Sequence, residues 1–178
     1  ANELGFIGDP KASDALCGCV VATDNPGDLF PIMESLGRNG GENAVTCLNV
    51  ALMLGVYDTE IVMADAKYTP RWDAGRFAIL AAAPEQIGSI KEAMATNKDA
   101  KVKTELAKWD AGIAVVESCK ADAACYEKTL GDVNVDWFAR EKAAFELARL
   151  KKGDVAAAEA ISKAFKVRNP DARISMAW

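Results

Sequence analysis

The sequence predicts an all-α protein, an α-solenoid of about four to five antiparallel helix hairpins stacked on one another. A loop acid or proline, then a basic residue, then apolar positions recur around Arg76, Lys103, Arg140 and Arg173, at separations of 27, 37 and 33 residues. Such periods are typical of stacked helical hairpins. Apolar residues elsewhere follow helical spacing, and no run shows the sustained two-residue alternation of a strand hairpin.

Composition and charge limit the classes of function. The 178 residues are 51% hydrophobic and 26% charged, which is ordinary for a globular domain. The most apolar stretch, 45–56, has about 12 residues against the roughly 20 of a transmembrane helix, so we expect no membrane span. Residues 1–60 hold nine acids and two bases, whereas the remainder holds 17 acids and 19 bases. This balance argues against nucleic-acid binding, which needs a strongly basic face.

The first 27 residues are expected to form an irregular segment or cap, and 28–178 to form the helical repeat domain. Turn signals stand at Gly8-Asp9-Pro10 and around Pro26. Between them, 14–23 suits either a short helix or a strand-like run. Three roles suit the segment: an end cap for the stack, a lasso onto a partner, or a small disulfide-tied element.

From residue 28 the spacing of apolar residues predicts helices. The first repeats apolar side chains at 29, 32, 33 and 36 and ends in the glycines of 37–41. The second, over 42–55, is apolar on most sides, which favours a central position. The third, over 58–67, ends before Pro70, and the fourth covers 71–83. A fifth opens at Pro84 and places 87, 90 and 94 on one face.

The second half of the chain continues this pattern. A long sixth helix is expected over 99–117 and a short seventh over 123–130. The eighth, over 136–151, carries an apolar stripe at 139, 143, 147 and 150. Gly153 and Asp154 cap a ninth helix, and Asn169 with Pro170 begins a tenth.

Two segments resemble the second helix of HEAT repeats, with an acid near the helix start, then an arginine, then apolar positions. They are 136–147, with Asp136 and Arg140, and 170–176, with Asp171 and Arg173. Weaker versions occur at 75–76 and 102–103, and the resemblance covers 28–178, most strongly 122–178. It implies an α-solenoid whose inner face binds other proteins. It also implies a polar ladder along the stack, formed by Asp73, Arg76, Asp136, Arg140, Asp171 and Arg173, with Lys103 as a departure from the pattern.

The five cysteines and the absence of histidine form a second clue. Cys119 and Cys125 flank a short polar link, a spacing that allows a disulfide, with reduced thiols as the alternative. One of Cys17 and Cys19 pairs with Cys47 in the second expected bond, which leaves one thiol over. Without histidine the common catalytic triads are impossible within this chain, and we expect no catalytic, cofactor or metal site.

All four tryptophans fall on the expected second helices: Trp72, Trp109, Trp137 and Trp178. They suit an aromatic contact strip on the inner face, since tryptophan is enriched in binding hot spots. Packing between repeats is the alternative interpretation.

Three functions compete. The leading hypothesis is a noncatalytic interaction or scaffold subunit of an exported assembly, with other protein subunits as partners. The second is a small-molecule or pigment-binding protein or lyase, because HEAT-like repeats also occur in phycobilin lyases. The third is a thiol-redox protein centred on Cys17 and Cys19. The cysteines, and a chain that begins with Ala as after removal of a signal peptide, favour the bacterial periplasm or the cell exterior.

Overall fold

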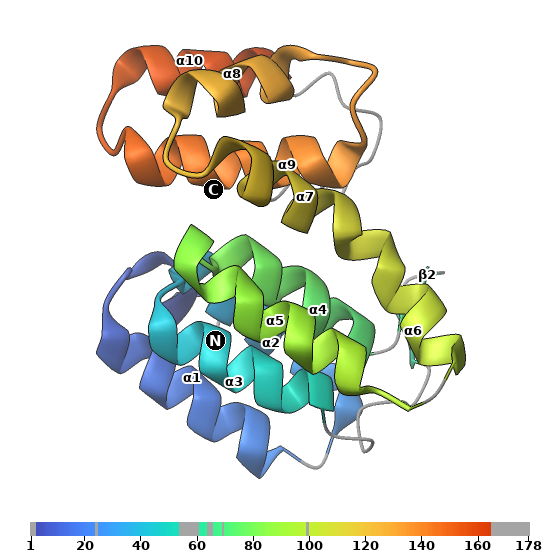
Figure 1. Ribbon diagram of the computed structural model, residues 1–178. Helices are drawn as coiled ribbons and strands as arrows, with labels where there is room; N and C mark the ends of the chain where they lie inside the picture. Colours follow the sequence, from blue (N-terminus) through green and yellow to red (C-terminus); the bar gives the residue numbers. More distant parts are fainter. Residues whose placement is uncertain are drawn as a thin grey trace. The chain divides into compact units, whose positions relative to one another are not determined.

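The structure is a computed structural model that describes residues 3–23, 25–53, 61–63, 66–68, 70–98 and 100–164. The chain forms two compact units, Ala1–Lys108 and Trp109–Trp178. Both units are predominantly helical over the described ranges (Figure 1). The predicted all-α class is therefore confirmed at this level.

The first unit consists of short helices joined by brief links, together with one small strand pair. In chain order its elements are η1 (Leu4–Phe6), α1 (Pro10–Ala22), α2 (Pro26–Asn39), α3 (Glu42–Met53), β1 (Ile61–Met63), β2 (Ala66–Tyr68), α4 (Pro70–Ala81), η3 (Pro84–Gln86), α5 (Ile87–Thr96) and α6 (Ala100–Leu106). The 3-10 turn η4 (Ala107–Trp109) spans the boundary to the second unit.

The segment 1–27 is not irregular throughout, because α1 is a regular helix of 13 residues, which agrees with the helical alternative for 14–23. The side chain of Asp9 accepts a hydrogen bond from the backbone N–H of Lys11 at 2.8 Å, and Pro10 occupies the first helical position. An acidic cap followed by proline is a helix start, and the same residues had suggested a turn. The helix packs on α2 and α3, so no boundary between units falls at residue 27.

One side-chain amide joins the N-terminal segment to the end of α2. Asn39 accepts a hydrogen bond from the backbone N–H of Gly8 at 2.7 Å. Its Nδ2 donates to the carbonyl of Asp9 at 3.0 Å and to Oγ of Ser13 at 2.6 Å. The start of the chain is thereby tied to the core of the unit.

The helix expected over 58–67 is wrong, since strands β1 and β2 occupy the described part of this range. They pair antiparallel, with Ile61 opposite Tyr68 and Met63 opposite Ala66. The β-branched Ile61 and Val62 and the aromatic Tyr68 favour extended backbone, and this local preference prevails over the weak helical spacing.

Sequential helices of the first unit pack in two layers. Helices α1, α3 and α5 lie side by side, and α2 packs beside α4 on the other side of them (Figure 1). Helix α3 contacts α1, α2, α4 and α5, which agrees with the central position expected for its apolar sequence. The fully buried side chains at the centre of this unit include Leu16, Met33, Leu36, Leu48, Phe77, Ile79 and Ile90.

The second unit contains α7 (Asp110–Cys119), α8 (Ala123–Gly131), α9 (Trp137–Leu150) and α10 (Val155–Ala164). Helix α9 packs on α7, α8 and α10, and α8 also packs on α10. The side chains of Asp122, Asp136 and Asp154 cap α8, α9 and α10 by accepting hydrogen bonds from backbone N–H groups of their first turns. The expected ranges 123–130 and 136–151 and the cap at Asp154 agree with these helices. The tenth expected helix lies outside the described residues.

The single helix expected over 99–117 is interrupted. Its range contains α6, the 3-10 turn η4 and most of α7, so the backbone tightens at Ala107–Trp109. Short 3-10 pieces of this kind often connect helical segments.

Two glycines permit close contacts between helices. A methyl group at position 37 would lie 3.0 Å from Cβ of Phe77, where α2 meets α4. A methyl group at position 112 would lie 2.9 Å from Cδ1 of Phe138, where α7 meets α9. Thus α2 and α4 in the first unit, and α7 and α9 in the second, come close together where a phenylalanine ring lies over a glycine.

Candidate functional site

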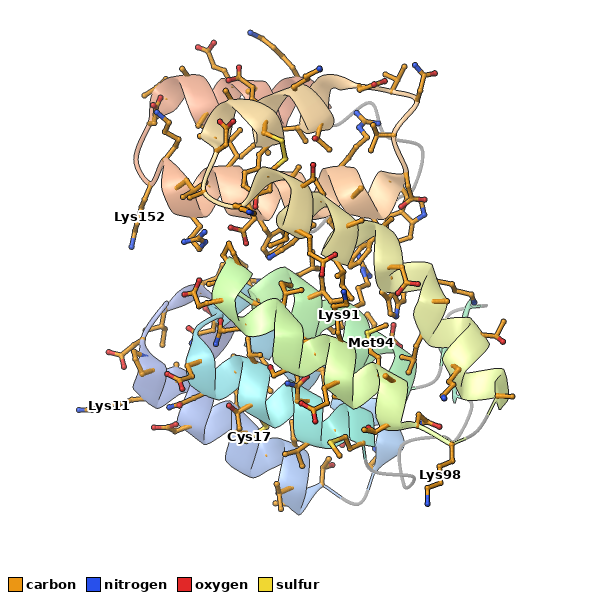
Figure 2. The ribbon with its side chains drawn as sticks, in the orientation of Figure 1. Lys11, Cys17, Lys91, Met94, Lys98 and Lys152 are labelled. Atoms are coloured by element: carbon orange, nitrogen blue, oxygen red, sulfur yellow. A yellow bond between two sulfur atoms is a disulfide. The ribbon has the colours of Figure 1, made fainter. Side chains whose placement is uncertain are left out.

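A disulfide joins α1 to α3 in the first unit. The Cα atoms of Cys17 and Cys47 lie 5.7 Å apart, within the range that disulfides adopt. One turn earlier, Nδ2 of Asn43 donates a hydrogen bond to Oδ1 of Asp14 at 2.8 Å. Both links join residues about 30 positions apart, so the two helices run parallel (Figure 2 labels Cys17 on α1). The expected pairing of Cys47 is confirmed, with Cys17 as its partner.

Apolar side chains are exposed beside this disulfide. Val21, four residues after Cys17, is 74% exposed, and Val50, three residues after Cys47, is 47% exposed. A spacing of three or four places each valine on its cysteine's side of the helix, one turn further along. We call Gly18, Val21, Thr46, Val50 and Met53 the seam patch; the last two share one side of α3 with Thr46.

The seam patch contains no charge. The sequence has no charged residue over 15–22 or over 43–53. The apolar sequence of 42–55 predicted a central position, and its exposed side was not foreseen. The signal was present, because a helix that carries one charged residue, Glu42, in twelve has no means of making its solvent face polar.

Cys19 is the remaining thiol, and it is exposed. It follows Cys17 by two residues, so it lies on a different side of α1. Cys17 and Cys19 are therefore not bonded to each other, since Cys17 is already bonded to Cys47.

The second disulfide closes the turn between α7 and α8. The Cα atoms of Cys119 and Cys125 lie 5.4 Å apart, as their spacing predicted. Lys120 in this turn has a positive φ of 53°, and its carbonyl accepts a hydrogen bond from the hydroxyl of Tyr126 at 2.7 Å. Burial raises the pKa of Tyr126 to about 12, and the negative charge of Glu146 adds to the rise.

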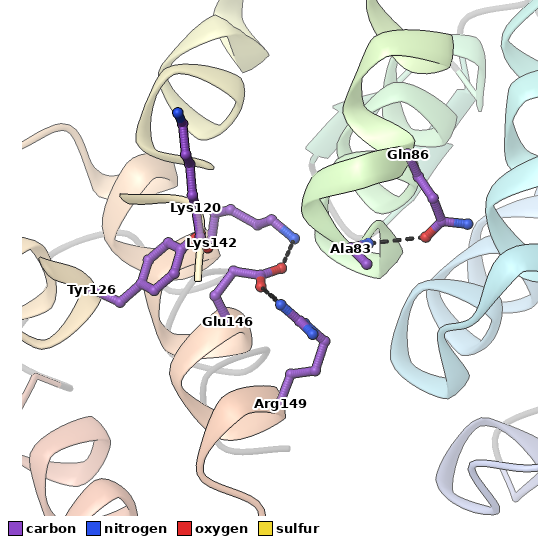
Figure 3. Close-up of polar contacts among 7 residues, drawn as sticks. All are labelled: Ala83, Gln86, Lys120, Tyr126, Lys142, Glu146 and Arg149. Atoms are coloured by element: carbon purple, nitrogen blue, oxygen red, sulfur yellow. Dashed lines mark hydrogen bonds and ion pairs between the residues drawn. The ribbon is translucent and has the colours of Figure 1, made fainter. Parts of the chain in front are cut away.

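Helix α9 carries a buried ion pair, and an exposed arginine extends it (Figure 3). Nζ of Lys142, whose side chain is fully buried, lies 2.6 Å from Oε1 of Glu146. A guanidinium nitrogen of Arg149 lies 2.6 Å from Oε2 of the same carboxylate. Burial lowers the pKa of Lys142, and the ion pair with Glu146 opposes that shift. Sequence analysis missed this group, although its spacing of four and three residues is the spacing of helical ion pairs.

Arg140 connects the ends of two neighbouring helices. Its side chain is buried, and Nε donates to the carbonyl of Leu130 at 3.0 Å, near the end of α8. Another guanidinium nitrogen donates to the carbonyl of Ala164 at 3.4 Å, at the end of α10. The last carbonyls of a helix lack partners within it and carry partial negative charge, so the buried guanidinium suits the end of α8.

Five residues of the predicted polar ladder lie in the described part of the chain: Asp73, Arg76, Lys103, Asp136 and Arg140. The acid of the eighth expected helix, Asp136, accepts a hydrogen bond from the backbone N–H of Phe138 at 2.8 Å and so acts as a helix cap. Asp73 and Arg76 lie on α4 in the first unit, and Arg76 is buried. Lys103 is exposed on α6. The last two ladder residues, Asp171 and Arg173, lie outside the described residues.

Two of the four tryptophans belong to an aromatic cluster in the second unit. The rings of Trp109 and Trp137 meet edge to face at 6.1 Å, and each also contacts the buried ring of Phe138. Both indoles are half-buried. They therefore take part in packing while they keep some surface in solvent. The side chain of Trp72 and the whole of Trp178 lie outside the described part of the chain.

No α-helix in the described ranges combines the length and the apolar character that a bilayer crossing requires. Among the same residues, no three Cys, Asp or Glu side chains gather in an arrangement that suits a metal ion. A comparison with protein-family models finds no match to this chain, and a comparison with curated proteins finds no significant match. The resemblance to HEAT repeats therefore stays a prediction from the sequence.

Proposed function

We propose that this chain is a noncatalytic interaction or scaffold subunit of an exported protein assembly, built as a HEAT-like stack of helix hairpins. The order of packing carries the proposal. In the first unit α1 packs on α2 and α3 packs on α4, while α1 also contacts α3 and α2 also contacts α4. Each hairpin therefore buries its apolar side against the next hairpin in the chain, as in repeat proteins.

The same order recurs in the second unit. There α8 packs on α9, α7 contacts α9, and α8 contacts α10. The hairpins that we propose among the described residues are α1/α2 and α3/α4 in the first unit and α8/α9 in the second. The number of about four to five stays a prediction from the sequence.

A stack of this kind favours binding over catalysis. Its helices present long rows of side chains to solvent, and such surfaces commonly engage other proteins. The half-buried Trp109 and Trp137 and the exposed seam patch supply the aromatic and apolar groups that interfaces use.

The two disulfides support export, because bonds of this type persist in oxidising compartments. The test is alkylation of the unfolded chain with and without a reductant. A native preparation should take up label at Cys19 alone before reduction and at all five cysteines after it. Several reactive thiols before reduction would contradict export.

Purification of the native chain with its neighbours tests the interaction role. The tagged chain should elute from a size-exclusion column with another protein in fixed proportion, in the absence of crosslinker. A lone monomer that no other protein accompanies, even after mild crosslinking in the cell, would refute a scaffold role.

A further inference from the structure

We infer that the seam patch docks a partner helix that is apolar on one face and basic along its edges. The inference rests on the proposed function and names the surface and the chemistry of one partner. It follows from three properties of α1 and α3: exposed apolar groups, an uncovered backbone between them, and a surplus of acids around them.

The apolar groups are contiguous across two helices. Val21 on α1 and Val50 on α3 each follow a cysteine of the same disulfide by one turn, so they lie next to each other on parallel helices. Met53, which is 59% exposed, lies one turn beyond Val50. Single exposed apolar residues are ordinary, whereas a contiguous group marks an interaction site. A flexible methionine at its edge adapts to the side chains of a partner.

The centre of the patch is sterically open. Gly18 lies one turn before Val21, and a methyl group there would meet no atom within 4 Å. At residue 18, therefore, no side chain covers the backbone of α1. A partner helix uses such a place to bring an apolar side chain close to the surface, with anchors at spacings of three and four residues.

Charge decides which partner fits. The patch is uncharged, but two exposed acids, Asp14 and Glu42, lie near the start of the two parallel helices, against one base, Lys11. Residues 1–60 hold nine acids against two bases. A second copy would bring the same surplus and be repelled, whereas a helix edged with Lys or Arg is attracted.

The experiment is a selection of helix-length peptides displayed on phage against the wild-type protein, with counter-selection against the double variant Val21→Ser/Val50→Ser. The selected peptides should carry apolar residues at spacings of three and four and an excess of Lys and Arg. A synthetic peptide of the winning sequence, measured by fluorescence anisotropy, should bind the double variant at least about tenfold more weakly. Added salt should also weaken its binding to the wild type.

Val133→Ser/Val155→Ser is the matched control. Val133 is 74% exposed, as Val21 is, and both control valines lie in the second unit. These variants should change binding less than about twofold. Because all four valines are exposed, neither pair of substitutions removes a core side chain, and circular dichroism should show both variants folded.

Acidic or neutral winning peptides would overturn the inference, and so would binding that the seam variant does not change. A wild-type dimer that Val21→Ser/Val50→Ser dissociates would identify a second copy as the occupant and would equally overturn it. A different result would refute the proposed function. If the native partner stays bound to the seam variant, the interaction role stands and only this surface is wrong; if no native partner exists, the role itself is wrong.

Discussion

Removal of the disulfides, one at a time, measures how much each cross-link stabilises its unit. In the chain-entropy description, a disulfide stabilises the fold by restricting the unfolded chain, and the effect grows with the enclosed loop. The Cys17–Cys47 bond spans a sequence separation of 30, which corresponds to about 3.6 kcal/mol at room temperature. The Cys119–Cys125 bond spans 6, which corresponds to about 2.2 kcal/mol.

The two bonds form a matched pair, because each joins one buried and one half-buried cysteine. The double variants Cys17→Ala/Cys47→Ala and Cys119→Ala/Cys125→Ala therefore lose similar packing. Native-state hydrogen exchange, followed by mass spectrometry, reports the opening free energy of each unit separately. In the Cys17→Ala/Cys47→Ala variant the opening free energy of amides in α3 should fall. This fall should exceed by about 1.4 kcal/mol the fall for amides in α8 in the Cys119→Ala/Cys125→Ala variant.

Cys19→Ser is the control for this comparison, since Cys19 is exposed and forms no disulfide. It should change protection by less than about 0.5 kcal/mol. The entropic reasoning is refuted if the short-range bond proves as stabilising as the long-range one or more so. It is also refuted if protection falls equally in both units of either double variant.

Four further substitutions test individual contacts. Gly112→Ala should destabilise the second unit by about 1–3 kcal/mol, because its methyl group meets the ring of Phe138, whereas Gly18→Ala, which meets nothing, should stabilise α1 by up to about 1 kcal/mol. Tyr126 has its pKa raised to about 12 from about 10, so its folded state holds the proton longer. The raised pKa of Tyr126 contributes about 2–3 kcal/mol to the free energy of unfolding below pH 10, and this contribution is lost as the pH rises toward 12. Tyr126→Phe should remove that part of the pH dependence in urea melts. Arg140→Met should cost about 1–3 kcal/mol, because it removes the hydrogen bonds that the buried guanidinium donates to the carbonyls of Leu130 and Ala164.

Each of these expectations has a contrary result. A Gly112→Ala variant as stable as the wild type would show that the ring of Phe138 moves aside without loss of stability. A stability difference between wild type and Tyr126→Phe that stays constant from pH 9 to pH 12 would contradict the raised pKa. Unchanged exchange rates at the ends of α8 and α10 in Arg140→Met would show that the guanidinium does not hold these helices.

Helices with strong caps and clear spacing were predictable from the sequence. Asp136 and Asp154 precede α9 and α10 as the sequence indicated, and three of the four residues of the apolar stripe, Ala139, Ala143 and Leu147, are buried. The cysteine spacing likewise predicted the Cys119–Cys125 bond. In these cases local chemistry and tertiary packing favour the same structure.

Other features depend on contacts that spacing does not report. Asp9 with Pro10 suits a turn and a helix start equally well, and packing on α2 and α3 decides for the helix. Strands β1 and β2 each form because the other is there to pair with. The choice of Cys17 over Cys19 depends on the side of α1 that faces α3.

The candidate site was predictable in part. The sequence shows that the chain has no histidine and that its charge is unevenly distributed. Both properties support the proposed interaction role. The seam patch was not foreseen, because an apolar helix suggests burial until the position of its neighbours is known. The buried pair of Lys142 and Glu146 was missed for the opposite reason, since charged residues at helical spacing usually indicate a solvent face.

The amide of Asn39 makes the N-terminal segment sensitive to slow chemical ageing. Asparagine is a thermolabile residue, and loss of its side-chain nitrogen by hydrolysis leaves a carboxylate of nearly the same shape. A carboxylate accepts hydrogen bonds and donates none, so it would still suit the N–H of Gly8 but would face the carbonyl of Asp9 without a proton to share. Old preparations of the protein should therefore release the start of the chain before any other part of the first unit.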